Sequence, residues 1–207
     1  MRLPQLIALV SISFEYIQSC CFPSVFEVTK INTIIAEENS TNQEKIYFSA
    51  EIGKAAEVRT NEWGQTERKI YDKATKKRYV ITDENVCDVT DLYKSIQKMC
   101  MPPSAVFIGS TVLDNNNLTV NNYYVNISHE NSFIDINLMT IPIKEGVCFV
   151  VKRVIKFQNV TLTSEYINHT FEITDMSVFQ TPKQCNGANN GSILLTTSLL
   201  IILLIHI

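Results

Sequence analysis

Histidine is scarce in this chain of 207 residues, and the motifs of common catalytic sites are missing. Only His129, His169 and His206 occur. The pair His129-Glu130 is not followed by a second histidine at helical spacing, so the zinc metalloprotease motif is absent. No Gly-x-Ser-x-Gly nucleophile elbow is present either. We therefore predict that the protein is not an enzyme.

Further absences narrow the range of possible functions. No Cys-x-x-Cys motif occurs, which argues against a zinc ribbon and against a thioredoxin-type redox pair. The formal net charge is -3 and no basic stripe is present, which argues against nucleic-acid binding. The chain also lacks internal repeats and heptads. These absences favour a binding domain over a catalytic, DNA-binding or filamentous one.

Long apolar runs are lacking too, because a membrane-spanning helix needs ~20 apolar residues and both apolar segments here are shorter. Residues 6–14 follow Met1-Arg2, as in a secretory signal. Residues 193–207 follow a run of small polar residues and lack a basic flank. We expect a signal peptide over residues 1–19, a mature domain over 20–186 and a removed GPI-attachment signal over 187–207.

The expected lipid attachment site is Asn186, where small residues precede the tail. A single-pass helix is the alternative, and signal cleavage after Cys20 is another possible register. The predicted location is the secretory pathway and then the outer face of the plasma membrane, with shedding or a lysosomal location as alternatives.

Five N-glycosylation sequons lie within the expected mature domain. On an exported chain such sequons are surface positions that accept glycans. We predict glycans at Asn39, Asn117, Asn126, Asn159 and Asn168.

Six widely spaced cysteines are typical of disulfides in an exported domain. Cys20 and Cys21 are adjacent, and we expect at most one of them to fasten the N-terminus. Spacing alone leaves the connectivity open. The cysteines that we predict to be bonded are Cys20, Cys87, Cys100, Cys148 and Cys185.

Period-two alternation dominates the mature chain and predicts β-strands. The clearest case is residues 45–52, where Ile46 and Phe48 share one face. A polar turn at 73–76 predicts a hairpin. Many strands at short spacing favour an antiparallel sheet system. The other expected strands are residues 57–63, 66–72, 77–83, 105–113, 121–127, 133–143, 147–160 and 166–174.

One segment has helical spacing instead. Thr90-Asp91 can cap a helix, and Leu92, Ile96 and Met99 follow at intervals that put them on one side. Pro102-Pro103 would end it. We therefore predict one helix between the two groups of strands.

Several separated pieces of the chain resemble the ependymin-related family. They are Cys20-x-x-Pro23-x-x-Phe26, Ile70-Tyr71-Asp72 with residues 77–87 (KRYVITDENVC), Phe107-Ile108-Gly109-Ser110, residues 146–151 (GVCFVV) and Phe171-x-Ile173-x-x-Met176-x-x-Phe179-x-x-Pro182-x-x-Cys185. The last is the most specific, and all occur in the family's order.

The resemblance implies a mainly β (α+β) fold, in which curved antiparallel sheets form a half-barrel around an apolar cleft, with one or two short helices. This fold is similar to that of bacterial lipoprotein carriers of the LolA type. The family's properties imply secretion, glycosylation, a pocket for a hydrophobic ligand, calcium binding, and association with extracellular matrix and lysosomes.

We expect a carrier or sensor of a hydrophobic, lipid-like ligand at the cell surface. The alternative is an adhesion module that engages extracellular matrix without a small-molecule ligand. Ordinary core packing is the simpler explanation for any single apolar residue. The residues expected to line the pocket are Ile46, Phe48, Ile70, Tyr79, Ile81, Phe107, Phe133, Ile136 and Phe149.

Calcium is the one cofactor to consider, and no EF-hand loop is present. Asp83 and Asp114 are the candidate ligands, and solvated acids in turns are the alternative explanation for both. The oligomeric state is left open, a dimer included.

Overall fold

The computed structural model describes residues 20–61, 63–82, 86–93, 100–113, 118–129, 132–183 and 185. They form one open antiparallel sheet of eleven strands, in the order β6-β5-β4-β3-β2-β1-β11-β10-β9-β8-β7. This confirms the predicted mainly β, curved antiparallel fold. The strands are β1 (Val25–Ile35), β2 (Ser40–Ser49), β3 (Lys54–Thr60), β4 (Thr66–Asp72), β5 (Lys77–Thr82), β6 (Val86–Asp91), β7 (Val106–Leu113), β8 (Leu118–His129), β9 (Ser132–Lys144), β10 (Val147–Phe157) and β11 (Val160–Thr170).

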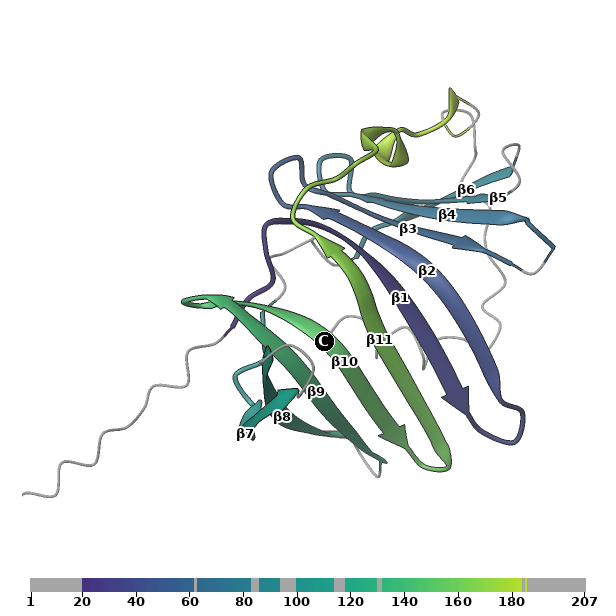
Figure 1. The fold of residues 1–207 in the computed structure, drawn as a ribbon. Helices are drawn as coiled ribbons and strands as arrows, with labels where there is room; N and C mark the ends of the chain where they lie inside the picture. Colours follow the sequence, from purple (N-terminus) through teal and green to yellow (C-terminus); the bar gives the residue numbers. More distant parts are fainter. Residues whose placement is uncertain are drawn as a thin grey trace, which may run out of the picture.

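The sheet consists of two meanders, β1–β6 and β7–β11, in which each strand pairs with the next in sequence. The meanders join where β1 pairs with β11, with Thr33 opposite Thr163. The strands curl into a half-barrel, and the short 3-10 helix η1 (Met176–Phe179) lies outside it (Figure 1). We call the concave face of the sheet the inner face and the other the outer face.

The inner face holds most of the buried apolar side chains. Residues opposite each other on neighbouring strands share a face, so the register extends this surface from strand to strand. One cluster spans β8, β9 and β10, and a second spans β1, β2 and the start of β10. Their buried members on these strands are Tyr123, Val125, Ile136, Leu138, Cys148, Val150 and Ile155, and Phe26, Val28, Phe48 and Phe149.

The C-terminal segment covers part of the outer face. Val178 and Phe179 of η1 are buried against Tyr47 and Ala56. The carboxylate of Glu27 on β1 accepts hydrogen bonds from the backbone N–H (3.2 Å) and the hydroxyl (2.8 Å) of Thr174. This segment therefore fastens the end of the chain across β1, β2 and β3.

Three disulfides, Cys20–Cys148, Cys21–Cys100 and Cys87–Cys185, fasten the two ends of the described chain. The expectation that at most one of Cys20 and Cys21 is bonded is wrong. Adjacent residues of an extended chain point to opposite sides, so the two thiols reach different partners.

Most predicted strands are present, with shifted ends. The expected strands 147–160 and 166–174 are instead β10 and β11, joined by a turn at Gln158 and Asn159. Strand β1 was not predicted. Thr90 and Asp91 end strand β6 and do not cap a helix, and the expected helical positions Ile96 and Met99 lie outside the described residues. Within the described part of the chain, no helix is long and apolar enough to span a membrane.

Substitution of Phe179 by alanine tests the role of the C-terminal segment. Phe179 is 4% exposed, and loss of a buried phenylalanine costs ~3–5 kcal/mol of unfolding free energy. Met176, in the same helix, is 52% exposed, so Met176→Ala should change stability by less than about 0.5 kcal/mol. Urea unfolding measures both. Equal effects of the two substitutions would show that the segment does not stabilise the sheet.

Candidate functional site

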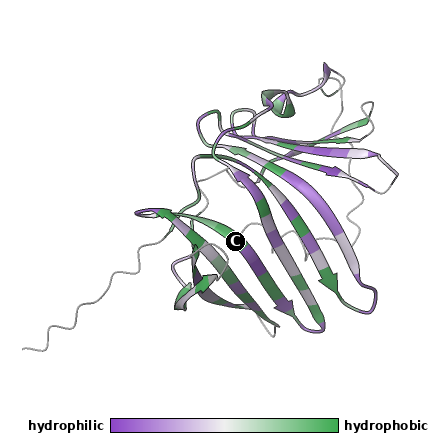
Figure 2. Ribbon diagram, in the orientation of Figure 1, coloured by the Kyte–Doolittle hydropathy of each residue, from purple (hydrophilic) through white to green (hydrophobic). Residues whose placement is uncertain are grey.

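The inner face continues beyond the buried clusters into partly exposed apolar side chains. Ile127 and Ile134 pack beside the first cluster, Ile46 packs beside the second, and Tyr166 contacts both. Phe22 also packs against both clusters, and its ring stacks on Phe149 with centroids 6.0 Å apart. Hydrophobic and hydrophilic residues alternate along the long central strands (Figure 2). The result is an apolar surface that runs from β8 to β2.

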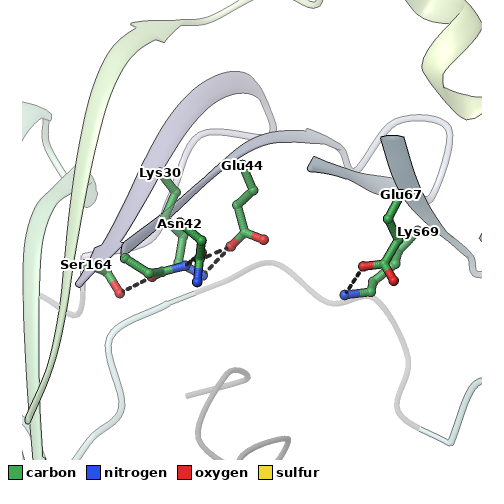
Figure 3. Close-up of polar contacts among 7 residues, drawn as sticks. Lys30, Asn42, Glu44, Glu67, Lys69 and Ser164 are labelled. Carbon is green, nitrogen blue, oxygen red and sulfur yellow. Dashed lines mark hydrogen bonds and ion pairs between the residues drawn. The ribbon is translucent and has the colours of Figure 1, made fainter. Parts of the chain in front are cut away.

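Polar side chains interrupt this surface at the middle strands. The Ser164 hydroxyl donates to Asn32 Oδ1 (2.7 Å), and Asn32 Nδ2 donates to Asn42 Oδ1 (3.1 Å) and to Glu44 Oε1 (3.3 Å). Lys30 Nζ lies 2.6 Å from the same Glu44 oxygen. Labelled members of this network gather on one side of β1 and β2 (Figure 3). Lys30, Asn32 and Ser164 are buried, and we call these five residues the polar network.

A second polar area lies beyond β2 on the same face. Burial, followed by the negative charge of Glu44, raises the pKa of Glu57. Burial and then the charge of Glu57 raise the pKa of Tyr71. The Arg78 guanidinium lies 5.8 Å from the centre of the Tyr71 ring. The inner face is therefore apolar toward β8 and β9 and polar toward β3–β5.

The structure separates the predicted pocket residues. Ile46, Phe48 and Ile136 lie on the inner face, Phe149 packs there against Phe26, and Phe107 lies at the edge beside Tyr123 with ring centroids 5.5 Å apart. The other four do not join them. Ile70, Tyr79 and Ile81 cluster with Cys185 under the C-terminal segment on the outer face, and Phe133 is exposed on that face.

Sequence reasoning missed other inner-face residues. Phe26 and Val28 belong to β1, and Leu162 and Tyr166 belong to a strand whose predicted start was six residues too late. The sequence motif Cys20-x-x-Pro23-x-x-Phe26 includes Phe26 but does not predict a strand there. The adjacent run Val25–Val28, which carries three apolar residues, was the signal available for a strand.

Four of the predicted metal, glycan and anchor positions lie outside the described residues, namely Asp83, Asp114, Asn117 and Asn186. Among the residues described, no group of three or more His, Cys, Asp or Glu side chains is placed to hold a metal ion. The side chains of the other sequon asparagines, Asn39, Asn126, Asn159 and Asn168, are exposed.

His169 is half-buried although it lies inside a sequon. Its ring meets Phe149 edge-on, with centroids 3.9 Å apart. Burial lowers the pKa of His169 below its usual 6.5, and a hydrogen bond with the Val150 backbone opposes this only partly. A neutral imidazole packed on an aromatic ring is a core contact.

The match to known families covers most of this architecture from β4 onward. Residues 64–185, more than half of the 207, match the family model described as Ependymin. The chain belongs to the ependymin family. This confirms the resemblance found in the sequence motifs. No curated protein matches the sequence.

Three solved structures are similar to this ependymin-family chain. An uncharacterized conserved protein from Thermus thermophilus aligns with TM-score 0.55 and 7% identity, over 79% of this chain and 88% of that one. A LolA superfamily protein from Nitrosomonas europaea aligns with TM-score 0.46 and 7% identity, over 78% of this chain and 92% of that one. The lipoprotein LppX from Mycobacterium tuberculosis aligns with TM-score 0.41 and 10% identity, over 72% of this chain and 88% of that one. The first likeness concerns the fold alone.

Breaking the pair Lys30–Glu44 tests how firmly the polar network is buried. Lys30→Met leaves the Glu44 carboxylate, whose side chain is 13% exposed, without its cation. We expect a loss of ~3–5 kcal/mol of unfolding free energy, whereas Lys30→Met with Glu44→Met should recover most of it. The exposed pair Lys152–Glu165 is the control, since Lys152→Met should cost at most about 1 kcal/mol. Similar losses in both single variants, measured by urea unfolding, would contradict this account.

Proposed function

We propose that this ependymin-family domain binds a hydrophobic, lipid-like ligand on its inner face, without catalysing a reaction. The observation that carries the proposal is the apolar inner-face surface of the two clusters, which Phe22 and Tyr166 both contact and whose partly exposed members include Ile127, Ile134 and Tyr166. Apolar surface of this kind on a concave wall is typical of small-molecule sites.

The arrangement of layers supports the same conclusion. An apolar sheet face needs a covering layer to leave water. The eleven strands form one sheet, and the described part of the C-terminal segment packs on the outer face. In the described part of the chain, no second sheet packs against the inner face. An apolar ligand bound there would gain ~25 cal/mol for each Å² of apolar surface removed from water.

Export supports an extracellular setting for this binding. Disulfides persist in oxidising compartments, and exposed sequon asparagines are available for glycans. We further propose that the signal peptide is cut before Cys20, because the Cys20–Cys148 bond requires that Cys20 be retained. The proposed anchor is a GPI lipid on Asn186, which would hold the domain at the outer face of the plasma membrane.

Two neighbouring residues on opposite faces test the proposed ligand surface. Ile134 pairs with Ile127 and belongs to the inner face, whereas Phe133 is 65% exposed on the outer face. Ile134→Asp should weaken binding of a fluorescent long-chain fatty acid about tenfold or more, because a charge replaces apolar contact with the chain. Phe133→Asp should leave the affinity unchanged. Fluorescence titration of glycosylated protein from eukaryotic cells measures both.

The outcomes of that titration separate the alternatives. No uptake of fatty acid by the unaltered protein would exclude a lipid-binding function. A loss of affinity in Phe133→Asp that matches the loss in Ile134→Asp would place the ligand elsewhere. Thermal melting of each variant checks that the domain is folded at the temperature of the titration.

The anchor is tested on intact cells. Phosphatidylinositol-specific phospholipase C should release the protein into the medium, because a GPI anchor is the only attachment that this enzyme cuts. A chain that stops at Asn186 should be secreted without treatment. Protein that stays on treated cells would favour a single-pass helix, although the apolar tail gives only ~22 Å of helix against ~30 Å of hydrocarbon.

A further inference from the structure

Arg153 is a buried cation in the middle of the inner face. It lies on β10, opposite Leu138 of β9 and Ser164 of β11, and it is 6% exposed. Its Nε atom has no hydrogen-bond partner, and no carboxylate of the described residues forms an ion pair with it. The guanidinium carries a positive charge, and no acidic side chain of the described residues balances it.

A charge in this position is costly unless something balances it. Arginine is rarely buried without a partner, because removing its charge from water is strongly unfavourable. The neighbouring polar side chains do not supply an anion. Ser164 already donates its hydroxyl hydrogen to Asn32, and the carboxylate of Glu44 is already paired with Lys30. The polar network is therefore balanced within itself, and Arg153 stands beside it.

A second unsatisfied group lies on the same face. Thr140 of β9 is fully buried, and its hydroxyl has no hydrogen-bond partner. Thr140 is two residues from Leu138, which is directly opposite Arg153, so both side chains belong to one surface. A guanidinium and a hydroxyl together provide donors of the kind that a carboxylate or phosphate accepts.

The apolar surroundings define the rest of the ligand. On one side of Arg153 lies a row of opposed residues, Val125, Ile136, Ile155 and Leu162. On the other side lie Tyr166 and the aromatic group around Phe26 and Phe149. An anion bound at Arg153 is therefore flanked by apolar walls on which a hydrocarbon chain can lie.

We propose that Arg153 binds the anionic head group of an amphiphile, a carboxylate or phosphate, whose hydrocarbon chain lies on the inner face. The proposal rests on the hydrophobic-ligand function above and deepens it by naming the charge of the head group. Arg153 provides the cation, Thr140 adds a hydroxyl donor, and the polar network supplies a hydrophilic border toward β1 and β2.

The test compares ligands that share a chain but differ in head group. Isothermal titration calorimetry measures oleate and oleyl alcohol, dodecyl phosphate and dodecanol, and then acetate and inorganic phosphate, which have no chain. The unaltered protein should bind each anionic amphiphile about ten- to a hundredfold more tightly than its neutral partner, the range of one or two charge-assisted hydrogen bonds. Arg153→Met should bring this ratio close to one, and Arg153→Lys should retain part of it.

Lys152→Met is the matched control. Lys152 is the adjacent residue, but it lies on the outer face, where it pairs with Glu165. This variant should keep the ratio of the unaltered protein. Ligand-free Arg153→Met should melt at the same temperature as the unaltered protein or higher, because it removes an unbalanced buried charge. A purely structural arginine would give the opposite shift in melting temperature.

Each remaining outcome has a definite meaning. Equal affinity of the unaltered protein for oleate and oleyl alcohol would overturn the head-group site and leave the hydrophobic-ligand function intact. Binding of neither would overturn both. If acetate or inorganic phosphate binds as tightly as the amphiphiles, Arg153 is a site for free anions. That result would overturn the proposal that the bound anion is the head group of an amphiphile. The ratio in the unaltered protein decides the proposal even if Arg153→Met does not fold.

Discussion

The pairing of the first strand with the last holds this fold together. Every other neighbouring pair in the sheet is consecutive along the chain, whereas β1 and β11 meet with Thr33 opposite Thr163. Without this pairing the chain would form two separate meanders, and β1 and β11 would each become an open sheet edge. The contact closes a loop of more than a hundred residues, so its entropic cost is high and its contacts must be specific.

The covalent and C-terminal contacts lie where they support that pairing. All three disulfides connect a residue before or within the first meander to a residue before, within or after the second, with sequence separations of 128, 79 and 98. Each shortens the loop that the β1–β11 pairing must close. The Thr174–Glu27 hydrogen bonds support the β1–β11 pairing from the outer face, because they hold the chain that leaves β11 against β1.

Sequence reasoning located most strands, and it found strand ends best where a polar turn marks them. Strand β4 was predicted with its observed ends, and the turn before β5 at the right residues. Strand β1 was missed because its inner face carries Lys30 and Asn32 beside Phe26 and Val28, which destroys the alternation. Ile70 and Ile81 were placed on the wrong side because alternation gives two faces without saying which is concave. That choice depends on the C-terminal segment, which buries them from outside.

The same polar residues that hid β1 from prediction define its place in the sheet. Asn32 contacts Ser164 of β11 on one side and Asn42 of β2 on the other, so one side chain ties three strands together. A slip of one residue would turn Lys30 and Asn32 to the outer face and separate them from these partners. A wholly apolar β1 would tolerate such slips more easily. The polar network thus gives the junction of the two meanders its register. By the same placement it lies between the apolar part of the inner face on β8–β10 and the polar part on β3–β5.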